Sequence, residues 1–306
     1  MQRSFKLRIC NFHADTPCRL HRLNIPFEHT RLEAGAYAHL PYRFAFETYA
    51  FFSEKSLSDE EAWRIFHLRL RHFEDAVLHS SLPAPSFVIA VEDARLLAGK
   101  IERVAALRNL GVRVMTLVWG GESIIGGAHD TEIGLTPFGK AVVEECFRVG
   151  IVPDVSHASD RLADEVCEIA CSYHKPILAS HSNFRALCNL RRNQSDKQYL
   201  KIASLGGVSG ISMCPEHIST AENPSIPELI KHIEHGLSLD PHALVFGTDF
   251  DGIQSTPEKL PNTASLVALA DRLLSIGYSE STLDGLFFGN GIRFLKQAMP
   301  DLHFEF

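Results

Sequence analysis

Side chains that could bind a metal ion follow the first short apolar run of the chain. His13 and Asp15 are two residues apart, so on an extended segment both side chains point the same way. One imidazole and one carboxylate on the same side suit a borderline divalent metal ion. Taken alone, a His-x-Asp pair is a weak signal, because solvated or hydrogen-bonded pairs of this type are common.

Later apolar runs also end in side chains that could bind a metal ion or carry a proton. These side chains are Glu92, His157, His181 and Asp249. A carboxylate at the end of a buried run is costly unless it is paired or coordinated, although Glu92 would also suit the start of the next helix. The pattern predicts that Glu92 and the two histidines join the His-x-Asp pair as metal ligands. It predicts Asp249 as a general acid or base beside them.

Two other patterns resemble metal sites but have simpler explanations. Residues 249–252 have some likeness to a calcium loop, but the residues after them do not supply its remaining ligands. We therefore expect Asp251 to be a structural turn residue. Cys167 and Cys171 lie near His174, and a helix face with small buried thiols explains this spacing better than a metal clip.

Strand-like apolar runs alternate with amphipathic helical stretches along the chain. The predicted strands are 5–12, 42–52, 86–91, 112–119, 151–155, 176–179, 207–213 and 243–247. The predicted helices are 58–79, 96–110, 137–149, 160–173, 196–205, 226–237, 264–275 and 279–298. Ser58 and Glu61 have the spacing of a capping box. Pro137 and Gly150 are typical of a helix start and a helix end.

This alternation of strands and helices predicts an α/β fold with a parallel sheet. Eight units that close on themselves form a (β/α)8 TIM barrel of about 250 residues plus insertions, here as a single domain over residues 1–306. The alternative is an open doubly wound sheet, which would usually carry a glycine-rich dinucleotide loop after an early strand. No such loop is present. A barrel places its chemistry at the carboxyl ends of its strands, where the candidate ligands lie.

The composition excludes several classes of protein. The chain has 306 residues, of which 45% are hydrophobic and 22% charged, with a net charge of −7. This is a globular composition without the basic surplus that nucleic acids and anionic membranes require of a partner. No apolar run approaches the roughly 20 residues that span a bilayer. The first ten residues lack the apolar core of a signal peptide, so we expect no secretory signal. Seven cysteines without a paired framework suggest reduced thiols, so we expect a cytoplasmic protein.

Several motifs resemble the membrane dipeptidase (renal dipeptidase-like) family of zinc metallopeptidases, which has an amidohydrolase-type barrel. The matching stretches are Gly134-Leu135-Thr136-Pro137-Phe138-Gly139, Asp154-Val155-Ser156-His157, Ala179-Ser180-His181-Ser182-Asn183, Arg191-Arg192-Asn193, Gly247-Thr248-Asp249-Phe250-Asp251-Gly252 and Gly289-Asn290. The resemblance covers nearly the whole chain and is most specific from about residue 87 onward.

The resemblance implies a metallo-dipeptidase with two zinc ions per chain, other divalent metals being compatible with the same ligands. The implied ligands are His13 and Asp15 on one ion, Glu92 as the bridging carboxylate, and His157 and His181 on the second ion. Asp249 resembles the proton-transfer residue of the family, and Arg192 resembles the residue that binds the substrate carboxylate. The implied partner is a dipeptide substrate, and a homodimer is a further expectation.

Two departures from the family pattern keep other functions open. Asp93 and Ala94 stand where the family usually has two glycines, and Trp119 stands where it often has a histidine that contacts the substrate. His129 could substitute for that histidine, but a solvated loop histidine is the simpler expectation. The alternatives are another metal-dependent hydrolase of this barrel class, such as an amidase or lactonase, or a catalytically impaired member acting as a binding protein. A deaminase is disfavoured, because these enzymes commonly carry His-x-His on the first strand.

Overall fold

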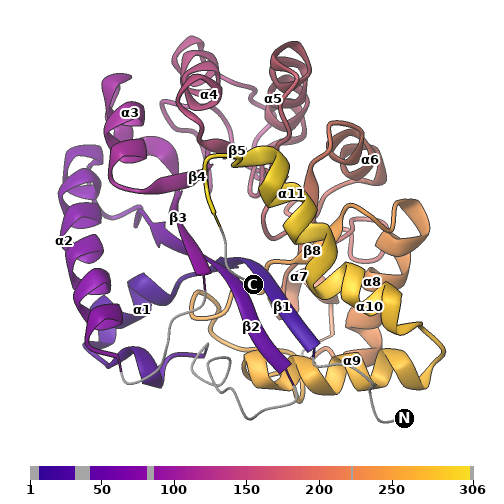
Figure 1. Ribbon diagram of the computed structural model, residues 1–306. Helices are drawn as coiled ribbons and strands as arrows, with labels where there is room; N and C mark the ends of the chain where they lie inside the picture. Colours follow the sequence, from indigo (N-terminus) through magenta and orange to yellow (C-terminus); the bar gives the residue numbers. More distant parts are fainter. Residues whose placement is uncertain (1–6, 32–41, 81–85, 222, 304–306) are drawn as a thin grey trace.

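Eight parallel strands form a closed barrel at the centre of the molecule (Figure 1). The computed structural model describes residues 7–31, 42–80, 86–221 and 223–303. The strands are β1 (Leu7–Ala14), β2 (Tyr42–Phe52), β3 (Ser86–Glu92), β4 (Val112–Thr116), β5 (Val152–Asp154), β6 (Leu178–Ala179), β7 (Val208–Ile211) and β8 (Leu244–Phe246). Each strand pairs with the next one in the sequence, and β8 pairs with β1. The predicted (β/α)8 barrel is confirmed.

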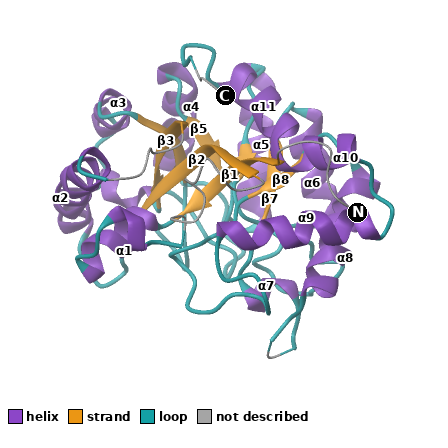
Figure 2. Cartoon of the chain, turned by 60° about the horizontal axis from the view of Figure 1, so that its bottom comes forward, coloured by secondary structure: helices purple, strands orange, loops and turns teal. Residues whose placement is uncertain are grey.

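Helices surround the barrel on its outer side (Figure 2). They are α1 (Thr16–Leu23), α2 (Asp59–Leu78), α3 (Glu102–Asn109), α4 (Pro137–Val149), α5 (Asp160–Tyr173), α6 (Asp196–Ser204), α7 (Pro215–Ile218), α8 (Ile226–Leu239), α9 (Leu266–Ser275), α10 (Glu280–Asp284) and α11 (Asn290–Ala298). Within the described residues, no helix combines the length and apolarity that a membrane crossing requires.

The local signals for helix ends are confirmed. The Ser58 side chain accepts a hydrogen bond from the backbone N–H of Glu61, and the Glu61 carboxylate accepts one from the backbone N–H of Ser58, so α2 begins with a full capping box. Gly150 ends α4 in the left-handed conformation, with φ 81°. Strand β2 has the predicted bounds, whereas residues 5 and 6 of the first predicted strand lie outside the described residues.

The structure differs from the prediction where short-range geometry interrupts a helix. The predicted helix 96–110 is a 3-10 turn, η3 (Ala94–Leu97), followed by α3. Ala98 and Gly99 between them have φ values of 51° and 74°, which an α-helix cannot contain. The predicted helix 279–298 contains a π-helical turn, η5 (Gly285–Gly289), between α10 and α11. Helices α1 and α7 are absent from the prediction, because they have only eight and four residues.

Apolar side chains fill the amino end of the barrel. Phe12, Val88 and Val114 on the strands belong to one cluster with Phe294 and Leu295 of α11. Figure 1 shows α11, in yellow, lying across this opening of the barrel. Because hydrophobic packing closes this end, polar side chains and a cavity are expected at the opposite, carboxyl end.

Gly247, directly after β8, marks a close approach between two parts of the barrel. A Cβ atom at this position would lie 1.7 Å from the backbone oxygen of Ser180, directly after β6. We expect Gly247→Ala to force these segments apart and to lower the free energy of unfolding by about 1–3 kcal/mol or more, measured by urea denaturation. Gly285→Ala is the control, because its Cβ would meet nothing closer than 3.8 Å. Equal stability of the two variants would contradict the close approach.

Candidate metal centre

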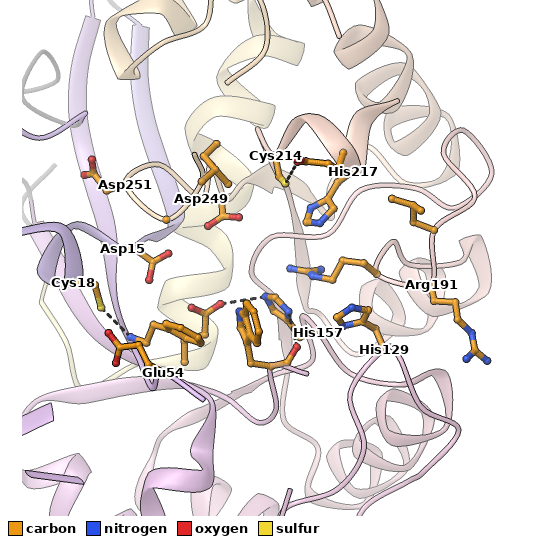
Figure 3. A pocket seen from close by; sticks show the side chains of 18 of the residues that line it. Asp15, Cys18, Glu54, His129, His157, Arg191, Cys214, His217, Asp249 and Asp251 are labelled. Carbon is orange, nitrogen blue, oxygen red and sulfur yellow. Dashed lines mark hydrogen bonds and ion pairs between the residues drawn. The ribbon is translucent and has the colours of Figure 1, made fainter. Parts of the chain in front are cut away.

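The predicted ligands converge at the carboxyl ends of the strands. The residues are His13 in β1, Asp15 after it, Glu92 at the end of β3, His157 after β5, His181 after β6 and Asp249 after β8. They lie at or directly below a cavity of about 580 Å³. Figure 3 shows Asp15, His157 and Asp249 facing this cavity. His13 and His181 are each only 1% exposed, so the cluster is almost closed to solvent on its inner side.

Glu92 lies at the centre of the cluster. Its Oε1 atom is 3.2 Å from Nε2 of His157 and 3.5 Å from Nε2 of both His13 and His181. The Nε2 atoms of His157 and His181 are 3.0 Å apart. Asp15 Oδ2 lies 3.5 Å from His13 Nε2. The structure therefore brings together all five residues that were predicted as ligands.

These distances fit the coordination of metal ions. Zinc bonds to nitrogen and oxygen are about 2.0–2.2 Å long, so neighbouring ligand atoms on a tetrahedral ion lie about 3.3–3.6 Å apart. Among the described residues, His13 Nε2 and Asp15 Oδ1 are buried without a hydrogen-bond partner, which is costly for a polar atom. Asp249 forms a second group with them, its ligand atom within 4.8 Å of theirs. A bound cation would satisfy these atoms.

The second ring nitrogen of each histidine has a hydrogen-bond partner of its own. His157 Nδ1 donates to the backbone oxygen of Trp119 at 3.0 Å. The Nδ1 atoms of His181 and His13 lie 2.8 and 3.4 Å from the hydroxyl of Ser180. A proton on Nδ1 leaves the lone pair of the neutral imidazole on Nε2, and all three Nε2 atoms face Glu92. This hydrogen-bond network is the type that orients histidine ligands around a metal ion.

The electrostatics of the cluster favour positive charge at its centre. Burial alone would lower the pKa of His13, but the carboxylates of Glu92 and Asp15 outweigh burial and raise this pKa from 6.5 to about 10. Burial lowers the pKa of His157 and of His181 well below 6.5. A divalent cation would supply the charge that the carboxylates require, with all three imidazoles neutral.

Asp249 combines an unusual backbone conformation with a perturbed carboxyl group. Its φ is 62°, a sparsely populated value for a residue other than glycine, and its backbone N–H donates to the oxygen of His13. Burial raises the pKa of Asp249 to about 7, and the neighbouring Asp15 carboxylate adds to this shift. A pKa near neutrality suits a group that takes and returns a proton. Asp251 instead accepts hydrogen bonds from Thr16 and Arg31, in agreement with its predicted structural role.

Arg192 brings a positive charge to the wall of the same cavity. Its Nη2 donates to the backbone oxygen of His181 at 2.9 Å, and its Nη1 donates to the hydroxyl of Ser182 at 3.3 Å. Among the described residues, its Nε has no hydrogen-bond partner. The guanidinium is thus held rigidly beside the candidate metal centre, where it can meet an anionic group of a ligand.

The two departures from the family pattern have different consequences. Asp93 has a φ of 72°, a conformation that glycine adopts easily, and its side chain accepts a hydrogen bond from the backbone N–H of Arg95. The backbone therefore adopts a left-handed conformation here although the residue is not glycine. The Trp119 ring stacks on that of His157, with centroids 5.6 Å apart. His129, expected to be solvated, is half-buried and lines the cavity, so that expectation is wrong.

Two further cavity residues are absent from the prediction. Cys214 and His217 line the cavity beside Arg192, and Figure 3 shows His217 on the wall opposite Asp15. Burial lowers the pKa of His217 well below 6.5, and the charge of Arg192 adds to this effect. Both residues lie at or near helix α7, which follows β7. They lie three and six residues beyond the end of β7 at Ile211, so a search limited to the strand ends does not find them.

The fold and the cluster at its carboxyl end place the protein in the class of (β/α)8 barrels with a candidate metal centre. The chain belongs to the membrane dipeptidase family, peptidase family M19, whose model matches residues 82–300. Dipeptidase 3 of Macaca fascicularis is 29% identical over 220 residues, which are 69% of this chain and 44% of that protein. An uncharacterised protein of Klebsiella pneumoniae is 29% identical over 228 residues, 70% of this chain and 82% of that protein.

Solved structures share the whole fold of the chain. A metallopeptidase from Rhodobacter sphaeroides, bound to a phosphinate mimic of the dipeptide L-Ala-D-Ala, has a TM-score of 0.84 at 20% identity and covers 96% of this chain and 99% of that one. Dipeptidase AC, a metallopeptidase of family M19, has a TM-score of 0.83 at 21% identity and covers 96% of this chain and 99% of that one. This chain spans less than half the length of the Dipeptidase 3 proteins that it matches, 44% for the macaque protein.

Proposed function

We propose that this protein is a zinc-dependent dipeptidase with two zinc ions per chain. The observation that carries the proposal is the position of Glu92 Oε1, within 3.5 Å of three imidazole Nε2 atoms at the base of an open cavity. Membership of the dipeptidase family supports a dipeptide as the substrate. His13 and Asp15 would hold one ion, His157 and His181 the other, and Glu92 both.

The residues around this centre have complementary roles in the proposed reaction. Zinc ions bound there would supply an activated water and polarise the peptide carbonyl. Asp249, at the edge of the centre, takes the proton of the attacking water and passes it to the leaving amine. Arg192 binds the carboxylate at the C-terminal end of the substrate, which favours short peptides over long ones. Burial around the cluster excludes bulk water from these charges.

The metal content tests the centre directly. We expect about two divalent ions per chain after purification without chelator or after zinc reconstitution, measured by elemental analysis. His181→Ala should lose at least one of them, because a water molecule does not replace a buried imidazole without loss of affinity. A wild-type protein that retains no stoichiometric metal after zinc reconstitution would refute the zinc proposal.

A hydrolysis screen separates the proposed function from its alternatives. The zinc-loaded protein should cleave dipeptides with a free C-terminal carboxylate. Preference for amides or lactones without a carboxylate would favour another hydrolase of the same barrel class. Stoichiometric metal without turnover of any of these substrates would favour a binding protein.

Location and assembly remain proposals. We propose a cytoplasmic protein, which the seven free cysteines support, and the homodimer stays a prediction for measurement by light scattering. Neither nucleic acid nor a membrane surface is proposed as a partner, because the net charge of −7 would oppose binding to both.

A further inference from the structure

Ser180 contacts two of the proposed zinc ligands at once. Its hydroxyl oxygen lies 2.8 Å from Nδ1 of His181 and 3.4 Å from Nδ1 of His13. The two imidazole rings lie against each other, with centroids 3.8 Å apart. Ser180 is 0% exposed, so a solvent molecule cannot take over these contacts.

Asp154 sets the direction of these hydrogen bonds. The Ser180 hydroxyl donates to Oδ2 of Asp154 at 2.6 Å, and its contact with the hydroxyl of Ser156 is longer, at 3.3 Å. A hydroxyl has one proton and two acceptor lone pairs. Once Ser180 donates to Asp154, it can only accept from the imidazoles. His181 and His13 must then carry hydrogen on Nδ1 and present the lone pair of Nε2 to Glu92.

Asp154 is itself held so that it can only accept. Its Oδ1 accepts from the backbone N–H groups of Ser156 and Ser180, at 3.0 and 2.8 Å. Its Oδ2 accepts from the hydroxyl of Thr116 at 2.6 Å as well as from Ser180. Backbone N–H groups cannot act as acceptors, so the orientation of the carboxylate is fixed. The residue is 0% exposed at the end of β5.

We propose that Asp154 and Ser180 are positioning residues that hold His181 and His13 as Nδ1–H tautomers. The inference rests on the proposed zinc centre. Because His13 and His181 are assigned to different ions, the same pair of positioning residues would orient a ligand of each ion. Partners of the second ring nitrogen commonly orient histidine ligands of metals. Here one serine, anchored by one carboxylate, serves two histidines.

Asp154→Asn tests the direction of these hydrogen bonds. It replaces an accepting carboxylate oxygen with a donating NH2 group and leaves the shape of the side chain nearly unchanged. The two backbone N–H groups retain the amide oxygen, so the NH2 group faces the hydroxyls of Ser180 and Thr116. Ser180 must then accept from the amide and turn its proton toward the imidazoles. The histidine that accepts this proton at Nδ1 carries its own proton on Nε2, the atom that binds metal.

We expect the zinc affinity of Asp154→Asn, measured by competition with a chelator, to fall by about 10–100-fold. Ser180→Ala removes the hydroxyl that accepts from both imidazoles but introduces no donor toward them, so its loss of zinc affinity should be smaller. Thr116→Val is the matched control, because it deletes one hydrogen bond to Asp154 and leaves the polarity unchanged. Its affinity should stay close to that of the wild type. In 15N spectra of histidine-labelled, metal-free protein, His181 should carry its proton on Nδ1 in the wild type, and Asp154→Asn should lose this signature. The comparison is made without metal, because zinc on Nε2 would force the proton onto Nδ1 in both proteins.

Three outcomes would overturn the inference: wild-type affinity in Asp154→Asn, an equal loss in Thr116→Val, or unchanged histidine tautomers. If Asp154→Asn does not fold by circular dichroism, Ser180→Ala decides, and wild-type affinity in that variant would refute the role of Ser180. Hydrolysis of dipeptides by the wild type is measured in parallel. A wild type that binds zinc but cleaves no dipeptide would refute the proposed function and leave the positioning roles standing.

Discussion

Asp249→Asn is expected to lower kcat by about 10²–10⁴-fold while the protein keeps its metal ions. The carboxamide has nearly the same shape as the carboxyl group, but it cannot take a proton from water and return it to the leaving amine. The geometry supports this role, because Asp249 lines the cavity at the edge of the cluster. Steady-state kinetics with a dipeptide, together with elemental analysis of the same sample, measure both parts of the prediction.

Glu216→Gln is the matched control for this experiment. Glu216 lines the same cavity, and its carboxylate contacts the thiol of Cys214 rather than the cluster. Its substitution should leave kcat unchanged. Turnover close to that of the wild type in Asp249→Asn would remove Asp249 from the mechanism. A loss of metal in this variant would instead identify it as a ligand, which its place in the group with His13 and Asp15 would explain.

Arg192→Ala is expected to raise KM for dipeptides, with kcat/KM lower by roughly 10–150-fold. A charge-assisted hydrogen bond contributes about 1.5–3 kcal/mol, which corresponds to this factor. The guanidinium is already ordered by its bonds to His181 and Ser182, so little further entropy is lost when a substrate carboxylate binds. For the wild-type protein, kcat/KM should fall by a similar factor when the dipeptide is replaced by its C-terminal amide.

The two changes remove the same interaction, so their effects should not add. In Arg192→Ala, kcat/KM for the amide should therefore be nearly the same as kcat/KM for the acid. Arg191→Ala is the control, since Arg191 also lines the cavity but forms an ion pair with Glu132. It should keep the discrimination between acid and amide. Fully additive losses in the cycle would mean that Arg192 does not contact the carboxylate.

Much of the candidate centre could be predicted because a barrel brings all its strand ends to one rim. His13, Glu92 and His181 are far apart in the sequence, yet each stands where an apolar run ends. The structure places the Glu92 oxygen within 3.5 Å of the other two Nε2 atoms. Types of residue at strand ends are therefore informative even without an estimate of any distance.

The missed residues depend on contacts that no short-range pattern encodes. His217 lies on the four-residue helix α7, and the position of His129 depends on how its loop packs after β4, where its backbone N–H donates to the oxygen of His157. The positioning role of Ser180 depends on Asp154, which lies 26 residues earlier. Such pairs meet only when β5 and β6 are neighbours in the closed barrel.

The alternation of strands and helices, the ends of α2 and α4, and the chemical types of the candidate ligands could all be inferred from local sequence patterns. These features follow from hydrophobic periodicity and from hydrogen bonds between residues a few positions apart. The position of His129 at the cavity and the contacts of Ser180 with two histidines follow from the three-dimensional packing instead. These contacts join side chains from distant segments, which compete for the same buried space and the same hydrogen-bond partners once the barrel has closed.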